Sequence, residues 1–229
     1  MFIKGLQKTT LLDYPGKVAC TIFTSGCNFR CPFCHNAPLV IHKDAGERIS
    51  ENDLFTYLEH RKNILDGVCI TGGEPLLQPD VKDFCRTVRQ MGLLVKLDTN
   101  GSFPQRLGSL LEAGLIDYVA MDIKNSKEEY AKTCGLQEFP VGVEESINIL
   151  RSASIPYEFR TTVVREFHTK ESLTALAKWI EGTERYFLQS FIDSGDLIGT
   201  QLSAYKEDEM KELLLAVRKF VPSAALRGI

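Results

Sequence analysis

The chain has 229 residues, of which 44% are hydrophobic and 25% charged, the balance of a globular protein large enough to form a core without disulfides. Its formal net charge is −3, so it lacks the basic excess that marks a nucleic-acid-binding surface. The sequence starts with no signal-peptide pattern and holds no apolar run near the ~20 residues that span a bilayer, and we expect a cytoplasmic protein with neither a membrane nor a nucleic-acid partner.

Residues 1–17 come first, and we interpret them as an N-terminal extension that packs on the domain. Six short runs rich in β-branched and aromatic residues follow, and this composition predicts strands. The predicted strands cover residues 18–23, 67–71, 93–99, 118–123, 159–164 and 186–191.

Apolar residues recur at helical spacing between and after these strands. A helix is expected after Ser50, because Ser50 and Asp53 form a capping pattern ahead of apolar residues. Further helices are expected within residues 81–88, 104–113, 143–151, 173–180 and 210–217. Residues 125–140 carry no pattern that assigns them.

Six strands that alternate with helices predict βαβ units and a parallel sheet in one α/β domain, residues 1–229. Six units are too few for an eight-fold barrel, which leaves an open doubly wound sheet or an incomplete barrel. In both folds ligands bind at the carboxyl ends of the strands. The polar and glycine-rich segments lie at these ends, and we expect them to share one site: residues 24–31, 71–75, 98–101, 122–124, 163–168 and 189–195.

Three cysteines, Cys27, Cys31 and Cys34, stand within eight residues after the first predicted strand. A disulfide framework is a poor explanation, because the chain has seven cysteines and cytosolic thiols stay reduced. Structural zinc needs four ligands, and His35 is too close to Cys34 in the chain to share its ion. The other four cysteines are interpreted as buried hydrophobic residues or have no assigned role: Cys20, Cys69, Cys85 and Cys134.

Three thiolates can instead hold three irons of a [4Fe–4S] cluster and leave the fourth iron open to a ligand. The spacing of these cysteines, with Phe33 before the last, resembles the cluster motif of the radical S-adenosylmethionine (SAM) superfamily. The sequence GGEP at residues 72–75 resembles the second motif of that superfamily. The resemblance implies that Gly72, Gly73 and Glu74 contact the amino group of SAM.

Further motifs resemble one branch of the superfamily, the activases of glycyl-radical enzymes. They are the Asp-x-Pro-Gly element at residues 13–16, Cys-His-Asn at 34–36, LDTNG at 97–101 and MDIK at 121–124. Within the branch the chain most resembles the activating proteins of anaerobic ribonucleoside-triphosphate reductase. This resemblance implies a partial (β/α)6 barrel, in agreement with the six predicted units.

Two acidic residues at neighbouring strand ends, Asp98 and Asp122, suggest a cation site, because hard cations prefer oxygen ligands. The resemblance implies a monovalent cation held by Asp98, Thr99 and Asp122 beside SAM. The alternative for Asp98 is an ordinary turn with a self-capping side chain. Lys124 is a candidate to neutralise the SAM carboxylate, and the roles of Arg160 and His168 stay open between the site and ordinary packing.

The resemblance implies an enzyme that cleaves SAM reductively and generates a glycyl radical on a partner, with anaerobic ribonucleotide reductase as the expected partner. It also implies a low-potential electron donor such as flavodoxin. No catalytic residue is expected beyond those that hold the cluster and SAM. Two alternatives remain: a radical SAM enzyme that acts on a small molecule, like a deazapurine synthase, and a non-catalytic zinc or Fe–S binding module.

Overall fold

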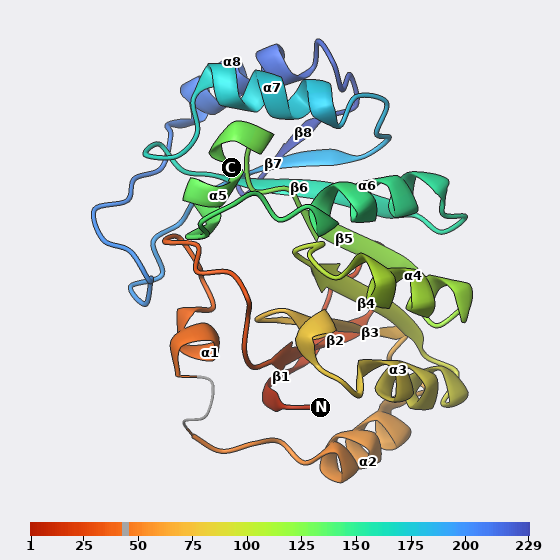
Figure 1. The fold of residues 1–229 in the computed structure, drawn as a ribbon. Coiled ribbons are helices and arrows are strands. Elements are labelled where there is room, and N and C mark those ends of the chain that lie inside the picture. The colour runs from red at the N-terminus through yellow and green to blue at the C-terminus, as the bar shows by residue number, and fades with distance from the viewer. Residues whose placement is uncertain (43–45) are drawn as a thin grey trace.

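The computed structural model describes residues 1–42 and 46–229 (Figure 1). One eight-stranded sheet runs through these residues, and its strands lie in the order in which the chain forms them. β1 pairs antiparallel with β2, and every later neighbour is parallel. The strands are β1 (Ile3–Thr10), β2 (Ala19–Thr24), β3 (Gly67–Gly72), β4 (Leu94–Thr99), β5 (Tyr118–Asp122), β6 (Tyr157–Val163), β7 (Tyr186–Ser190) and β8 (Ala225–Arg227).

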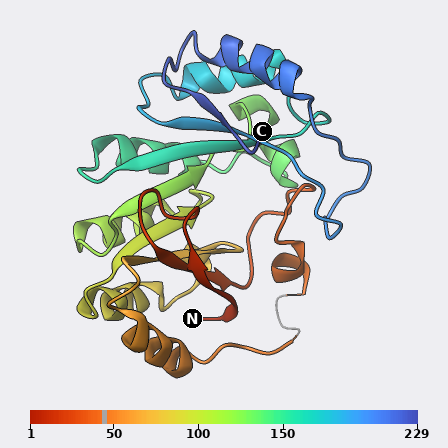
Figure 2. The ribbon, with the colours of Figure 1, turned by 180° about the vertical axis from the view of Figure 1, so that it is seen from behind.

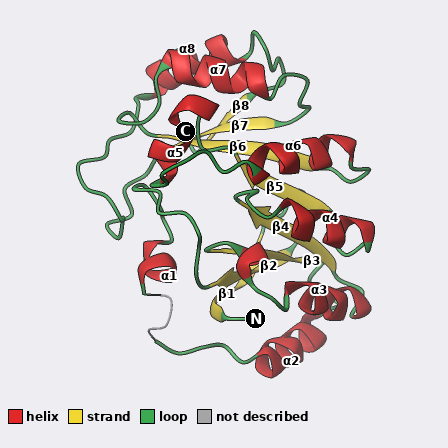
Figure 3. Ribbon diagram, viewed as in Figure 1, coloured by secondary structure: helices red, strands yellow, loops and turns green. Residues whose placement is uncertain are grey.

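The helices lie mainly along the outer side of the curved sheet, from α2 at the bottom of Figure 3 to α7 and α8 at the top. β1 and β8 are the two edges of the sheet, so strand pairing leaves the barrel open. The helices are α1 (Ala37–Ile41), α2 (Glu51–Arg61), α3 (Val81–Gln90), α4 (Pro104–Glu112), α5 (Lys127–Cys134), α6 (Gly142–Ser152), α7 (Lys170–Trp179) and α8 (Glu207–Val217), with a 3₁₀ turn η1 (Pro75–Leu77).

The α/β fold and the six βα units are confirmed, and each predicted strand agrees with an observed one to within two residues. The predicted helices are also present. Ser50 caps α2 by accepting a hydrogen bond from the backbone N–H of Asp53. Prediction missed four elements, β1, β8, α1 and α5. Residues 1–17 contribute β1, which lies beside β2 in Figure 2.

Two layers of side chains result from the alternation of the strands, because successive residues point to opposite faces. On β4, Val95 and Leu97 are fully buried in the core beneath the helices. Lys96 and Asp98 point to the other face, where they form an ion pair. The inner face of the barrel therefore carries charged side chains on β4, although parallel sheets are usually apolar on both faces. A smaller apolar cluster of Tyr14, Ala19, Tyr118 and Ala120 is packed against Leu94 of the same strand.

A search of the described residues for a helix both long and apolar enough to cross a bilayer finds none.

Candidate functional site

The cysteine loop, residues 25–36, follows β2 and lies directly against the end of β3. The Gly26 carbonyl accepts a hydrogen bond from the Glu74 N–H (2.8 Å). A Cβ atom on Gly73 would stand 1.9 Å from the Gly26 oxygen, and one on Gly72 would stand 2.3 Å from the Thr24 nitrogen. Both glycines are therefore required for the close approach of the two backbones.

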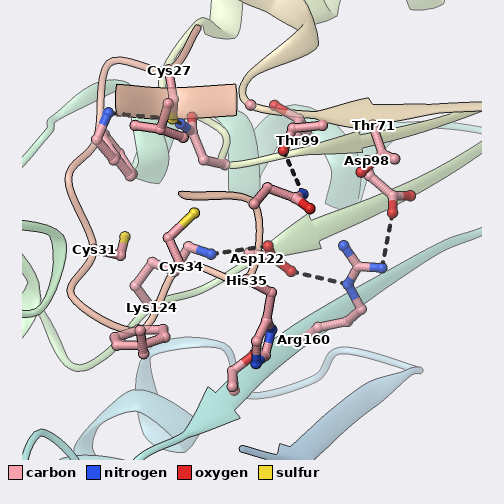
Figure 4. Close-up of a pocket in the computed structure, with 18 of the residues that line it drawn as sticks. Cys27, Cys31, Cys34, His35, Thr71, Asp98, Thr99, Asp122, Lys124 and Arg160 are labelled. Atoms are coloured by element: carbon pink, nitrogen blue, oxygen red, sulfur yellow. Dashed lines mark hydrogen bonds and ion pairs between the residues drawn. The ribbon is translucent and has the colours of Figure 1, made fainter. Parts of the chain in front are cut away.

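A cavity of about 230 Å³ opens between this loop and the carboxyl ends of the strands (Figure 4). The three cysteines line one side of it. The opposite side comes from the ends of β3, β4, β5, β6 and β7. Among the residues that the sequence suggested, this side holds Gly72, Gly73, Asp98, Thr99, Asp122 and Lys124. Segments as far apart in the sequence as Cys27 and Arg160 thus meet at one end of the barrel, as the strand-end rule predicts.

The cysteine thiols are partly or fully buried, which disfavours their charged form. Burial raises the pKa of Cys27 to about 12 and also raises that of Cys34. A hydrogen bond with the Cys134 thiol instead lowers the pKa of Cys31. Iron binding would therefore have to displace protons from Cys27 and Cys34, as thiolate ligation requires.

The donor set suits a cluster better than a single ion. A single zinc ion needs its sulfur ligands at about 2.3 Å, so its thiols must converge on one point. Among residues 1–42 and 46–229, no group of three or more His, Cys, Asp or Glu is placed to hold a metal ion. The three cysteines instead border a cavity, and three soft thiolates are the ligands that Fe–S clusters use.

Glu74 differs from the expectation that its carboxylate meets a ligand in the cavity. Its side chain is fully buried and is not part of the cavity lining. It accepts hydrogen bonds from the Leu76 N–H (2.9 Å), the Thr99 hydroxyl (2.8 Å) and the Asn100 N–H (2.7 Å). Glu74 therefore ties the end of β3 to the end of β4, and only Gly72 and Gly73 of this motif face the cavity.

An ion-pair network crosses the floor of the cavity. Arg160 of β6 donates to Asp122 (2.9 Å) and to Asp98 (3.1 Å), and Lys124 donates to Asp122 (3.0 Å). Burial disfavours ionisation of both carboxyl groups, but the charge of Arg160, together with that of Lys96 beside Asp98 and of Lys124 beside Asp122, outweighs it and holds the pKa of both aspartates below their usual range. Both aspartates are therefore ionised.

His168 does not line the cavity, although it acts on a residue that does. It is fully buried, and its Nδ1 accepts from the Val164 N–H (3.0 Å). This leaves Nε2 as the donor to the Lys124 carbonyl, at 2.7 Å. Burial lowers the pKa of His168, so the ring is neutral and fixes the backbone that carries Lys124.

Two asparagines complete the site, and sequence reasoning gave them no role. Asn36 donates to the Gly72 carbonyl (2.7 Å), which joins the cysteine loop to β3. Asn100 donates to the Asn28 side chain (3.0 Å) and lies 3.8 Å from the Cys27 sulfur. Both asparagines lie within motifs that the sequence analysis identified, Cys-His-Asn and LDTNG. Their polar side chains in these motifs were the available signal for a role in the site.

Comparisons with known proteins agree with this geometry. The sequence model of the Radical SAM superfamily matches residues 21–180. A Methanocaldococcus jannaschii protein with the provisional name of glycyl-radical enzyme activating enzyme is 30% identical over 99% of this chain and 96% of its own. The pyruvate formate-lyase-activating enzyme of Clostridium pasteurianum is 26% identical over 78% of this chain and 76% of its own.

Among solved structures, Streptococcus suis SuiB bound to S-adenosylmethionine matches with a TM-score of 0.69 and 14% identity. The match covers 89% of this chain and 48% of SuiB. At this level of identity the similarity concerns the fold alone.

Proposed function

The chain belongs to the radical SAM superfamily, in the branch of glycyl-radical-enzyme activating enzymes, and on this premise we propose that it activates an anaerobic ribonucleoside-triphosphate reductase. The observation that carries the proposal is the cavity in which Cys27, Cys31 and Cys34 face the ends of five strands. A cluster held by three thiolates keeps one open iron, and the cavity supplies the space and the polar groups for a cosubstrate beside it.

The three cysteines would hold a [4Fe–4S] cluster. Such a cluster supplies one electron that splits SAM into methionine and a 5′-deoxyadenosyl radical, which removes a hydrogen atom from a glycine of the partner enzyme. The protein would bind and orient the cluster and SAM and would exclude water from them, as in other cofactor enzymes. SuiB, a protein with the same fold, has been crystallised with SAM.

The residues of this chain have separable tasks in SAM binding. The backbone of Gly72 and Gly73 lets the amino-acid end of SAM approach β3, and Asn36 holds that backbone in place. Lys124 offers an ammonium group to the SAM carboxylate, and His168 fixes its position from behind. Phe29 and Phe33 border the cavity from the cysteine loop and keep water away.

The partner and the electron donor are the more specific parts of the proposal. The motifs at residues 11–36, 97–101 and 121–124 resemble the activase branch as a whole, and the choice of the reductase rests on the closer resemblance of the chain to the reductase activases. The curated relatives include activating enzymes of pyruvate formate-lyase. A flavodoxin-like protein would supply the electron. A cytoplasmic location, where thiols stay reduced, belongs to the same proposal.

The deciding experiment is an anaerobic radical-transfer assay. The iron-reconstituted protein is incubated with SAM, a reductant and the candidate reductase, and a glycyl radical is sought by electron paramagnetic resonance. We expect a glycyl doublet together with one 5′-deoxyadenosine for each radical formed. A doublet with a formate-lyase-type enzyme alone would refute the choice of partner. Turnover of a small molecule, without a doublet on any partner, would refute the activase assignment.

Substitution of one cluster ligand tests the site itself. Cys31→Ala removes one of three thiolates, and we expect loss of the cluster absorbance and at least about 100-fold slower SAM cleavage, since removing a metal ligand costs at least as much as the 10- to 100-fold effect of an outer contact. Cys85→Ala is the matched control, because Cys85 is buried on α3 away from the cavity. Normal iron content in Cys31→Ala would contradict the three-ligand assignment.

A further inference from the structure

We infer that Arg160 is the built-in counter-charge of Asp98 and Asp122, and that this chain binds SAM without the monovalent cation suggested by its sequence. The inference rests on SAM binding in the proposed cavity. Arg160 is a positioning residue in this scheme, because it fixes the two carboxylates that border the cosubstrate.

The carboxylate oxygens that a cation would need are already bound. Asp98 Oδ2 accepts from Arg160 Nη1 (3.1 Å), and Asp98 Oδ1 pairs with Lys96 Nζ. Asp122 Oδ1 accepts from Arg160 Nε (2.9 Å), and Asp122 Oδ2 accepts from Lys124 Nζ (3.0 Å). Each of the four oxygens therefore faces a cationic side chain, and Figure 4 shows the contacts of Arg160 with both aspartates.

The third residue of the expected cation site is also engaged elsewhere. The Thr99 hydroxyl donates to the buried Glu74 carboxylate (2.8 Å) and accepts from the Gly101 N–H (3.1 Å). A cation between Asp98 and Asp122 would have to compete with Arg160 for the carboxylate oxygens, and the Thr99 hydroxyl has a single lone pair left for it. Binding of the cation would therefore cost hydrogen bonds that the folded protein already forms.

The strand register explains why an arginine serves this purpose. Asp122 of β5 is the direct register partner of Arg160 on β6, and Asp98 is one strand further along the sheet, opposite Ala120. Alanine leaves room above β5 for a long side chain to cross. The planar guanidinium can donate to two carboxylates at once, whereas a lysine offers a single nitrogen.

The charges of the network point the same way. Two carboxylates, Asp98 and Asp122, stand against three cationic side chains, Lys96, Lys124 and Arg160, which leaves one positive charge in excess. The side chains of Asp98 and Arg160 are only 14% and 13% exposed, so solvent screens this charge weakly. The carboxylate of SAM would bring one negative charge to Lys124 at the edge of this network, whereas an added cation would increase the excess.

The test compares SAM binding to the iron-reconstituted protein in tetramethylammonium, sodium and potassium chloride at equal ionic strength. Binding is followed by calorimetry, which does not depend on turnover. We expect the dissociation constant of the wild type to change by less than about twofold among the three salts. Binding that strengthens about tenfold or more in sodium or potassium would overturn the inference.

Variants of Arg160 extend the test. In Arg160→Gln the carboxylates lose their shared partner, so SAM should bind about 10- to 100-fold more weakly in tetramethylammonium and recover in potassium or sodium. The SAM affinity of Arg160→Lys should lie between that of the wild type and that of Arg160→Gln. Arg165→Gln is the matched control, since Arg165 forms an exposed pair with Glu209. Unchanged SAM binding by Arg160→Gln in tetramethylammonium would also overturn the inference.

A second measurement is independent of SAM and of the cluster. In the iron-free proteins, potassium in place of tetramethylammonium should raise the melting temperature of Arg160→Gln more than that of the wild type, because only in the variant does one oxygen of each carboxylate lose its arginine partner. Equal responses would count against the inference. Failure to bind SAM in every salt would overturn the proposed function along with it, whereas salt-dependent binding would overturn this inference alone.

Discussion

At the scale of single residues, the carboxyl group of Glu74 shows how a residue at a functional motif can serve the fold. Its three donors come from two different strand ends, which fixes the spacing of β3 and β4 at the mouth of the cavity. Burial raises its pKa to about 7, against the hydrogen bonds that favour the ionised form. The ionised group is therefore held at a cost within the folded protein.

This cost makes stability depend on pH. A carboxyl group whose folded pKa is about 7 contributes stability that is fully present below its unfolded pKa near 4.5 and is lost as pH rises through 7. The loss amounts to about 3 kcal/mol at neutral pH. We expect Glu74→Gln to flatten the pH dependence of the free energy of unfolding between pH 4.5 and 7, measured by urea titration of the iron-free protein. A wild type that gains stability over this range would contradict the prediction.

The same residue shows a limit of sequence reasoning. The GGEP motif correctly located the strand end and the two glycines that face the cavity. The orientation of the Glu74 side chain depends on hydrogen-bond donors from Thr99 and Asn100, about 25 positions away in the sequence. A local sequence pattern cannot predict such distant partners. Arg160 is a similar case, because its partners are set by strand register.

At the scale of elements, α5 holds the cysteine loop from the side opposite β3. The Cys134 carbonyl at its end accepts from the Arg30 N–H (2.8 Å). Tyr130 is fully buried and meets Phe29 of the loop edge-on, with ring centroids 6.5 Å apart. The helix was missed because its eight residues carry only three buried side chains, two of which are threonine and cysteine. Local patterns recovered the helices whose buried faces are made of larger apolar residues. They missed β1, which is the longest strand, and only its two end residues are buried.

Truncation of Tyr130 tests the role of α5. Tyr130→Ala removes a ring that also contacts Phe139 and Trp179, and we expect a loss of about 3–5 kcal/mol in the free energy of unfolding. Iron retention after gel filtration should fall as well, because the loop loses its lateral support. Tyr57→Ala, on the partly exposed face of α2, should retain iron normally. Full iron retention in Tyr130→Ala would show that α5 does not hold the loop.

At the scale of the whole molecule, the cysteine loop joins the two halves of the open barrel. It contacts β3 through Gly26, and it reaches the segment after β7 through Pro32, whose carbonyl accepts from the Gly199 N–H (2.7 Å). His35 adds a hydrogen bond to the Ile192 carbonyl (2.7 Å). Segments near both edges of the sheet therefore meet at a single loop, as Figures 1 and 2 show on the same side of the molecule.

Iron removal should accordingly affect a distant part of the chain. We expect amide hydrogen exchange in residues 191–205 to rise about tenfold, or ~1.4 kcal/mol, when iron is chelated, because metal binding stabilises the elements that its ligand loop contacts. Residues 104–112 of α4 serve as the internal control and should change little. A uniform rise over the whole chain would indicate global destabilisation instead.

The charged side chains on the inner face of the sheet have a consequence for the interpretation of related sequences. Strands of a parallel sheet that is covered on both sides are nearly continuous apolar runs, yet β4 alternates Val95, Lys96, Leu97 and Asp98. In a chain whose helical segments already indicate parallel connections, such alternation indicates a sheet with helices on one face only rather than an antiparallel meander. The position of each charged residue along its strand then indicates, from sequence alone, how far from the carboxyl end of the strand a bound ligand will contact that residue.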